Sequence, residues 1–287
     1  MAARPVRRPA GSRAGTRQCP VNATRTPVPI LMYHEVASRP DSASPLAVPP
    51  AAFAAQLACL QAAGFTTITV SELAAAFAGG AELPERPIAL TFDDGYADFH
   101  QTALPLLQRC GFTATVFVTT GWVEDAGPVP NPRPARMLSW RQVLEVSAAG
   151  VEIGAHSHTH PELDRLGGAR LARELRDSKS LLEDRLGGPV PALAYPFGYS
   201  STRVRQAARA AGYQHACAVA NAMADAGRDR FALPRLTVRR STRQRTFDQM
   251  MRGQHVPVIF AKDRSLTKGW AMVRRTRAVV RAVAGGS

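Results

Sequence analysis

The sequence predicts an α/β protein in which parallel strands curl into a distorted (β/α) barrel of about seven or eight strands. The first observation behind this prediction is that short apolar runs alternate with helical patterns along residues 28–240, which is typical of βα units joined into a parallel sheet. The second is the number of units: about seven or eight in some 230 residues favour a TIM-like barrel over an open sheet.

The predicted strands are short apolar runs rich in β-branched residues, as expected for strands buried in a parallel sheet. The first begins at Val28, where a proline- and arginine-rich start gives way to an apolar run ending in a histidine. In chain order the predicted strands cover residues 28–34, 66–70, 88–92, 113–118, 151–155, 191–195, 215–219 and 236–238.

The predicted helices fill the intervals between these strands. Phe53, Leu57 and Leu60 recur near helical spacing, and Gly64 then stops the helix. Ser71 is expected to begin the second helix, because serine is a favoured N-cap residue. In chain order the predicted helices cover residues 51–63, 71–80, 97–108, 139–149, 168–186 and 201–211.

Charge divides the chain into three predicted parts. Residues 1–27 hold six arginines and no acid, lack periodicity, and are expected to be a disordered basic tail. Residues 262–287 hold seven lysines or arginines against one acid and form a second basic tail. Each tail contributes +6 to the formal net charge of +14, so residues 28–261, the predicted folded domain, carry only +2.

This distribution of charge limits the partners of the protein. A nearly neutral body argues against a basic nucleic-acid groove across the fold, so no nucleic acid is expected. Leu266, Trp270, Val273 and Val280 lie near one face of a helix in the C-terminal tail. Such a basic amphipathic helix would contact a membrane surface or a polyanion; the alternatives are solvated tails, or docking of the apolar stripe on the protein's own barrel.

Neither a membrane anchor nor an ordinary export signal is visible. No apolar run approaches the roughly 18 residues of a membrane span, and the N-terminal arginines precede no apolar core of a signal peptide. The location is therefore left open between the cytoplasm and the cell envelope. The four cysteines form no Cys-x-x-Cys pair, which argues against a zinc knuckle or a redox motif.

Two carboxylates, Asp93 and Asp94, directly follow the predicted strand 88–92, and Gly95 allows the chain to turn. Adjacent like charges repel each other, and a strand end is the usual place for function in α/β proteins. A bound cation would relieve the repulsion, or one carboxylate would bind a metal while the other handles protons. The alternative is an ordinary Asp-Asp-Gly turn.

Three histidines follow the predicted strand 151–155. His156 and His160 can converge on one metal ion if the segment forms a single turn, and Pro161 disfavours a helical conformation at His160. Two imidazoles and one carboxylate leave positions open on a divalent metal, which is typical of a catalytic site. Zinc is the expected ion, although nitrogen and oxygen ligands also suit cobalt, nickel, iron or manganese.

These two motifs, Thr-Phe-Asp-Asp-Gly at residues 91–95 and His-Ser-x-x-His at residues 156–160, resemble those of the polysaccharide deacetylases, the NodB-homology or carbohydrate esterase family 4. The resemblance covers roughly residues 28–240 and implies the same distorted (β/α) barrel. It implies that Asp93 is the catalytic base, and that the metal ligands are Asp94, His156 and His160.

The third family motif, Arg-x-Pro-aromatic-Gly, is only partly present. Tyr195, Pro196, Phe197 and Gly198 match its later positions and are candidate substrate-binding residues, whereas Ala194 stands where the family has arginine. The Asp-x-x-Asp-Trp motif and a C-terminal Leu-x-His are absent as well.

Residues 31–35, Leu-Met-Tyr-His-Glu, resemble the start of the poly-N-acetylglucosamine deacetylases, a branch in which the motifs look circularly shifted. In that branch an N-terminal strand supplies the histidine that other members carry late, which makes His34 the candidate general acid. Arg235 or Arg239, near the last strand, is the candidate replacement for the missing arginine.

The implied reaction is metal-dependent hydrolysis of an N-acetyl group on an N-acetylglucosamine-containing polysaccharide or glycan, with acetate and a free amine as products. Two alternatives remain at this point. One is an amidohydrolase of the same fold that acts on a small non-sugar amide. The other is a catalytically weak carbohydrate-binding protein. The presence of a candidate base beside three candidate metal ligands argues against this second alternative.

Overall fold

The computed structural model describes residues 26–38, 44–127 and 133–263 of the 287-residue chain. Most of both predicted basic tails, including the C-terminal amphipathic stripe, lies outside the described residues, so the tail and domain boundaries stay predictions. Within the described ranges, no helix is both long enough and apolar enough to cross a membrane.

All eight predicted strands are present in the described part of the chain, within a few residues of the expected bounds. They are β1 (Ile30–Tyr33), β2 (Thr66–Ile68), β3 (Pro87–Phe92), β4 (Thr115–Val118), β5 (Glu152–Ala155), β6 (Ala192–Ala194), β7 (His215–Cys217) and β8 (Leu236–Thr237).

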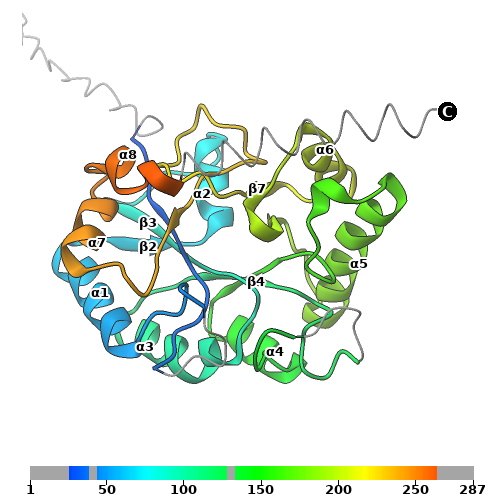
Figure 1. Ribbon diagram of the computed structural model, residues 1–287, viewed down its shortest axis with the longest axis horizontal. Coiled ribbons are helices and arrows are strands. Elements are labelled where there is room, and N and C mark those ends of the chain that lie inside the picture. The colour runs from blue at the N-terminus through cyan, green and yellow to red at the C-terminus, as the bar shows by residue number, and fades with distance from the viewer. Residues whose placement is uncertain (1–25, 39–43, 128–132, 264–287) are drawn as a thin grey trace, which may run out of the picture.

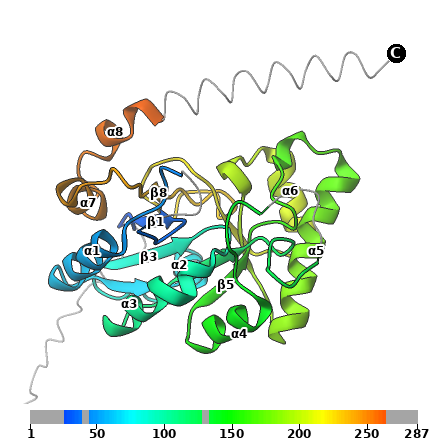
Figure 2. The same cartoon turned by 60° about the horizontal axis from the view of Figure 1, so that its bottom comes forward.

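These strands form one parallel sheet in the order β7-β6-β5-β4-β3-β1-β8, and β2 pairs with the first half of β3. A parallel bridge between Cys217 and Leu233 links the β7 edge to the segment that leads into β8. The sheet is therefore curled toward closure, and the predicted distorted (β/α) barrel is confirmed. β1, β3 and β8 lie side by side in Figure 2.

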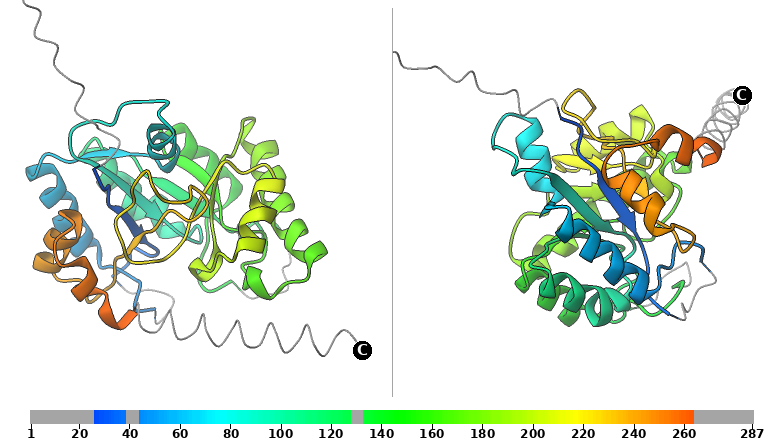
Figure 3. Two further views of the ribbon diagram at one scale, coloured as in Figure 1. Left: turned by 90° about the horizontal axis from the view of Figure 1, so that it is seen from above. Right: turned by 90° about the vertical axis from the view of Figure 1, so that its left-hand side faces the viewer.

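Helices surround the sheet, as Figure 1 shows, with α1, α3 and α4 along its lower side and α5 and α6 at the right. The described α-helices are α1 (Pro50–Ala62), α2 (Val70–Phe77), α3 (Leu104–Arg109), α4 (Trp140–Ala148), α5 (Gly168–Leu186), α6 (Thr202–Ala210), α7 (Gln244–Met251) and α8 (Val256–Ile259). The last two were not predicted. They flank β1 in the right panel of Figure 3, and α7 packs against α1.

One predicted helix start needs correction, and one predicted helix contains an irregular turn. The second helix begins at Val70, because the N-cap is Thr69, which forms a capping box with Glu72, and not Ser71. The helix predicted for residues 97–108 begins at Ala97 as expected and contains a π-helical turn at Phe99–Ala103 before the regular α3. The difference at Thr69 concerns a helix end, where local side-chain hydrogen bonds decide the boundary.

Alternation along the strands separates the barrel interior from the outer core. On β3, Ile88, Leu90 and Phe92 belong to the main apolar cluster under the outer helices, and Ala89 belongs to the inner one. Successive side chains of a strand point to opposite faces, so Asp93, four residues after Ala89, continues the inward row. On β1, β5 and β8 the same alternation produces a row of side chains that faces the barrel interior and ends in a polar residue.

The amino-terminal end of the barrel holds a separate polar cluster around Glu152. Its carboxylate accepts hydrogen bonds from the backbone N–H groups of Val70 and Ser71 and from the hydroxyl of Thr115. Ser71 Oγ also donates to Glu152 and lies 3.2 Å from His215 Nε2. A carboxylate at the first turn of α2 satisfies unpaired N–H groups and the helix dipole, so this cluster anchors α2 to β4 and β5.

Metal-free protein should lose stability as the pH falls from about 6.5 to 4, in part through His215. Burial lowers the pKa of His215 from 6.5 to about 4, so the unfolded chain binds a proton in this range that the folded chain excludes. The contribution of His215 is fully present above pH 6.5 and decreases by about 3 kcal/mol toward pH 4.

Urea denaturation of wild type and of His215→Gln at pH 7 and pH 4.5 tests this expectation. The variant should show a smaller loss of unfolding free energy between the two pH values. Equal losses in the two proteins would assign the acid sensitivity to other groups.

Candidate functional site

Three side chains at the carboxyl end of the sheet form a potential metal-binding group. The ligand atoms of Asp94, His156 and His160 all lie within 4.8 Å of one another. Asp94 Oδ1 is 3.4 Å from Nε2 of His156 and 3.2 Å from Nε2 of His160. Neighbouring ligands of a tetrahedral zinc ion are about 3.3 Å apart when the bonds are 2.0–2.1 Å, so the spacing fits a metal ion.

Hydrogen bonding also favours a cation between these groups. His156 Nδ1 lies 2.8 Å from the carbonyl oxygen of Ala194, which can only accept, so Nδ1 carries the proton and Nε2 presents a lone pair. Burial lowers the pKa of His156 to about 4, so the ring is neutral at pH 7. Asp94 Oδ1 is buried without a hydrogen-bond partner among the described residues. An imidazole lone pair and a carboxylate oxygen thus face each other, as two ligands of one cation do.

Asp94 is ionised in this site. Burial by itself would raise the pKa of Asp94, but the imidazoles of His160, His34 and His156 outweigh it and hold the pKa well below its ordinary value. An ionised carboxylate and a neutral imidazole are the protonation states that metal binding requires.

Backbone strain is concentrated around this group. Asp94, Ser157, His160 and Phe197 have φ values of 74°, 63°, 57° and 60°, in the left-handed region that costs a non-glycine residue about 1–2 kcal/mol. They make up four of the seven such non-glycine residues in the described ranges. Surrounding contacts must therefore hold these side chains in position.

The other carboxylate of the pair, Asp93, has a different partner. Both of its oxygens accept hydrogen bonds from Arg235, at 2.6 Å from Nη1 and 2.7 Å from Nη2. Asp93 is 3% exposed and Arg235 is 0% exposed, so the ion pair is fully buried. Burial alone would raise the pKa of Asp93, and the charge and hydrogen bonds of Arg235 more than compensate, so that the pKa is lowered.

Arg235 donates two further hydrogen bonds. Nε donates to the carbonyl of Ala218 at 3.3 Å, and Nη1 donates to Thr91 Oγ1 at 3.2 Å. Of the two arginines considered from the sequence, Arg235 is the one beside Asp93, whereas Arg239 pairs with Asp263. Arg235 therefore stays the candidate replacement for the arginine that the third motif lacks at Ala194.

His34 lies at the end of β1, next to both carboxylates. β1 pairs with β3 up to Tyr33 and Phe92, and the N–H of Asp93 donates to the carbonyl of Tyr33 at 3.0 Å. His34 is half-buried, its Nδ1 has no hydrogen-bond partner among the described residues, and its imidazole is one of the groups that lower the pKa of Asp94 and Asp93. The structure thus brings His34 to the same strand-end cluster.

The four residues of the third motif are not equivalent. Tyr195 is fully buried and its hydroxyl donates to the carbonyl of Phe231 at 3.0 Å, so its side chain packs in the core, and Pro196 is buried as well. A substrate contact at these two positions would therefore involve the backbone, and stays a prediction. Phe197 is 52% exposed. Gly198 has φ 74° and a Cβ there would lie 2.5 Å from Val219, so only glycine fits.

Aromatic rings enclose His160, and one of them was missed in the sequence. Trp122 stacks on the His160 ring at 4.6 Å, and Phe197 contacts His160 edge-on at 4.8 Å. Tyr199 in turn stacks beside Phe197 at 6.2 Å. Trp122 comes shortly after β4. Its position after a strand, like that of the carboxylates and histidines, is the signal that would have found it. The third histidine of the motif, His158, lies outside the metal group and contacts Thr120 Oγ1.

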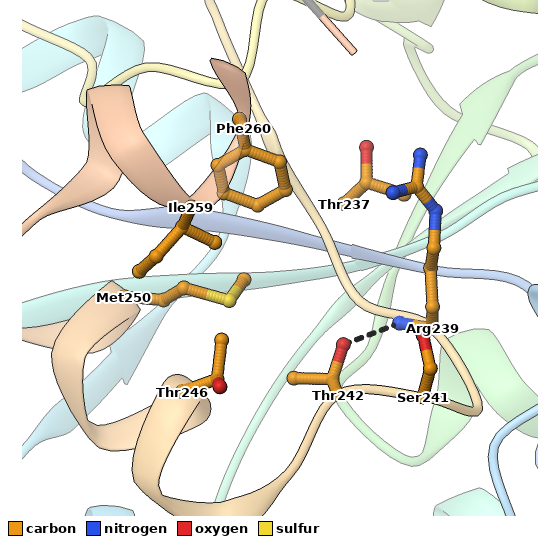
Figure 4. A pocket seen from close by; sticks show the side chains of 8 residues that line it. All are labelled: Thr237, Arg239, Ser241, Thr242, Thr246, Met250, Ile259 and Phe260. Carbon is orange, nitrogen blue, oxygen red and sulfur yellow. Dashed lines mark hydrogen bonds between the residues drawn. The ribbon is translucent and has the colours of Figure 1, made fainter. Parts of the chain in front are cut away.

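A small cavity of about 140 Å³ lies beyond the end of β8. Figure 4 shows that hydroxyl groups of Thr242 and Thr246 and the apolar side chains of Met250 and Phe260 line it. Arg239 also contributes to its wall, with its backbone N–H bonded to Thr242 Oγ1 at 2.9 Å. Apart from Arg239, none of the residues singled out from the sequence lines this cavity, so it is separate from the strand-end cluster.

Comparison with known proteins finds similarity to one protein family over part of the chain. The family model described as polysaccharide deacetylase matches residues 80–216. YxkH of Bacillus subtilis (strain 168) is 29% identical over 211 residues, which cover 74% of this chain and 71% of that protein.

Two further relatives bear on chemistry and fold. The poly-beta-1,6-N-acetyl-D-glucosamine N-deacetylase of Escherichia coli (strain K12) is 27% identical over 134 residues, which are 44% of this chain and 20% of that much longer enzyme. The structure of Streptococcus pyogenes deacetylase PplD in complex with acetate superposes with a TM-score of 0.72 at 26% identity, covering 79% of this chain and 99% of that one.

Proposed function

We propose, from the match of residues 80–216 to the polysaccharide deacetylase family and from the similar sequence and structure described above, that the chain is a metal-dependent hydrolase that removes N-acetyl groups from an N-acetylglucosamine-containing polysaccharide or glycan. The observation that carries the proposal is the convergence of Asp94, His156 and His160 beside a second carboxylate, Asp93, that makes no part of the ligand set. A site that only binds sugar has no need of that second carboxylate.

The bound metal would supply Lewis-acid polarisation of the acetamide carbonyl and of a water molecule, with Asp94, His156 and His160 as its ligands. Zinc is the proposed ion. It suits one carboxylate and two imidazole ligands with open coordination positions, and the ligand spacing supports that choice.

Proton transfer would then be divided between two residues of the chain. Asp93, kept ionised by Arg235, would take the proton of the attacking water as general base. His34 would give a proton to the nitrogen of the departing amine as general acid. A backbone N–H near Phe197 would donate a hydrogen bond to the oxyanion. The products are acetate and a glucosamine unit.

A polymeric substrate is the favoured class because of the exposed aromatic surface beside the site. Phe197 and its neighbour Tyr199 stack next to His160, and aromatic faces are suited to pack against sugar rings through their apolar C–H groups. The E. coli and other relatives named as poly-beta-1,6-N-acetyl-D-glucosamine N-deacetylases support this class.

Acetate release from a panel of N-acetylated glycans, measured with metal-free and zinc-reconstituted protein, tests the proposal. Reconstituted wild type should release acetate, and metal-free protein should not. His156→Ala should lose zinc binding and activity together, because it removes a ligand from the buried side of the group. His158→Ala is the matched control and should keep zinc, since His158 lies outside the group.

Absence of acetate release from every glycan by zinc-loaded protein would contradict the proposal. Release only from small non-sugar amides would instead favour an amidohydrolase with the same site.

A further inference from the structure

Helix α5 carries a carboxylate on the stripe that it buries. The residues on this stripe are Leu171, Glu174, Leu175, Ser178 and Leu182. Glu174 is only 8% exposed, and a buried carboxylate is costly unless hydrogen-bond donors surround it. α5 contacts β5 (Figure 2), whose carboxyl end leads into the candidate metal-binding loop.

Three hydrogen-bond donors of that loop bind Glu174. Oε2 accepts hydrogen bonds from the backbone N–H of His158 at 3.0 Å and of Thr159 at 2.8 Å. Oε1 accepts from the hydroxyl of Thr159 at 2.6 Å. His158 and Thr159 lie between His156 and His160 in the chain, so this one carboxylate holds the segment that sets where the two imidazoles lie relative to each other.

We infer that Glu174 is a positioning residue for metal binding, which keeps the loop in the conformation where His156 and His160 converge with Asp94. The inference rests on the metal site of the proposed function. The loop passes through the left-handed region at Ser157 and again at His160, a conformation that L-residues adopt only under outside constraint. Glu174 supplies that constraint from a helix that contributes no ligand.

The local hydrogen bonds of the loop do not replace Glu174. Ser157 Oγ accepts from the N–H of His160 at 3.1 Å, and the carbonyl of His158 accepts from Gly121 at 2.8 Å. These contacts use other atoms, so the N–H groups of His158 and Thr159 would be left without their acceptor if the carboxylate were removed. Buried N–H groups without partners favour rearrangement of the loop.

The chain offers a matched control at the opposite end of the barrel. Glu152 also accepts hydrogen bonds from two successive backbone N–H groups, those of Val70 and Ser71, and from a threonine hydroxyl, that of Thr115. Its removal should cost stability for the same reason as removal of Glu174. However, it lies away from the metal-binding loop, so zinc affinity should not depend on it.

The experiment measures zinc affinity by competition with a chromophoric chelator for wild type, Glu174→Leu, Glu174→Gln and Glu152→Leu. Glu174→Leu should bind zinc about 10–100-fold more weakly, as expected for the loss of a group that orients metal ligands. Glu174→Gln should stay close to wild type, because its amide oxygen still accepts both N–H groups and its amide nitrogen can donate to Thr159. Glu152→Leu should bind zinc like wild type.

Amide hydrogen exchange in the metal-free proteins gives a second readout. The amides of His158 and Thr159 should exchange faster in Glu174→Leu than in Glu152→Leu or wild type. If Glu174→Leu does not fold, Thr159→Val, which removes only the donor to Oε1, takes its place and should weaken zinc binding.

Wild-type zinc affinity in Glu174→Leu, or in Thr159→Val where that variant is used, would overturn the inference. So would an equal loss of affinity in Glu152→Leu. A wild-type protein that binds zinc tightly but releases no acetate would contradict the proposed function and leave this inference standing.

Discussion

Replacing Arg235 by methionine should lower the free energy of unfolding by about 3–5 kcal/mol, the usual cost of removing one partner of a buried ion pair. Both oxygens of Asp93 depend on the guanidinium, at 2.6 Å and 2.7 Å, and the two side chains are almost completely buried. Methionine fills much of the same volume but leaves a buried carboxylate without a counter-ion. Urea denaturation of the metal-free protein at pH 7 measures the effect.

The double variant Arg235→Met/Asp93→Asn is the control for this prediction. It removes the buried charge as well as its partner, so it should be more stable than Arg235→Met alone. Together with wild type and Asp93→Asn, the two variants complete the cycle that gives the coupling between the two residues. Removing one partner of a buried pair usually costs about 3–5 kcal/mol. If the free energy of unfolding of Arg235→Met is within about 1 kcal/mol of the wild-type value, the ion pair does not contribute to stability as the geometry indicates.

Asp93→Asn should reduce kcat by about 10²- to 10⁴-fold while zinc binding is retained, the range expected when a general base is lost. The amide keeps the shape of the side chain but cannot accept a proton at neutral pH. Asp93 is outside the group of three potential ligands, so its removal takes away no ligand. Acetate release and zinc content of the purified variant test both halves of the expectation.

The neighbouring substitution Asp94→Asn is the matched control, because it makes the same chemical change one residue further along the chain. It should lose zinc affinity, since Asp94 Oδ1 is the oxygen that lies between the two imidazoles. If Asp93→Asn keeps full activity, Asp93 is not the base. If both variants lose zinc equally, the division of roles between the two carboxylates is wrong.

Much of the fold could be predicted because strands and helices leave local patterns. The run at residues 88–92 and the glycine stop after residues 51–63 depend only on neighbours in the chain, and the corresponding β3 and α1 are present. The predictions failed where a boundary depends on one side-chain hydrogen bond, as at Thr69, the N-cap of α2. They also missed α7 and α8, which are only 8 and 4 residues long, although Phe247, Met250 and Met251 of α7 fall at helical spacing.

The candidate site was predictable for a related reason. Asp94 and the His156–His160 pair each follow a strand, and the carboxyl ends of parallel strands meet at one end of a barrel. Their convergence therefore followed from the strand assignments together with the family motifs. That the side chain of Tyr195 packs in the core was not predictable, because a motif position does not reveal which way a side chain points.

The sequence by itself determined which strand each candidate functional group follows: a histidine follows the first strand, two carboxylates follow the third, and a histidine cluster follows the fifth. Only the tertiary structure decided that Arg235, 142 positions from Asp93 in the chain, is the partner of that carboxylate, and that Glu174 of α5 holds the loop before His160. The physical reason is that a buried charge needs a partner in space, and spatial neighbours across a barrel leave no periodic pattern in the chain. The one local trace of each is a charged residue among uncharged buried ones: Arg235 within residues 233–238, and Glu174 on the buried stripe of α5.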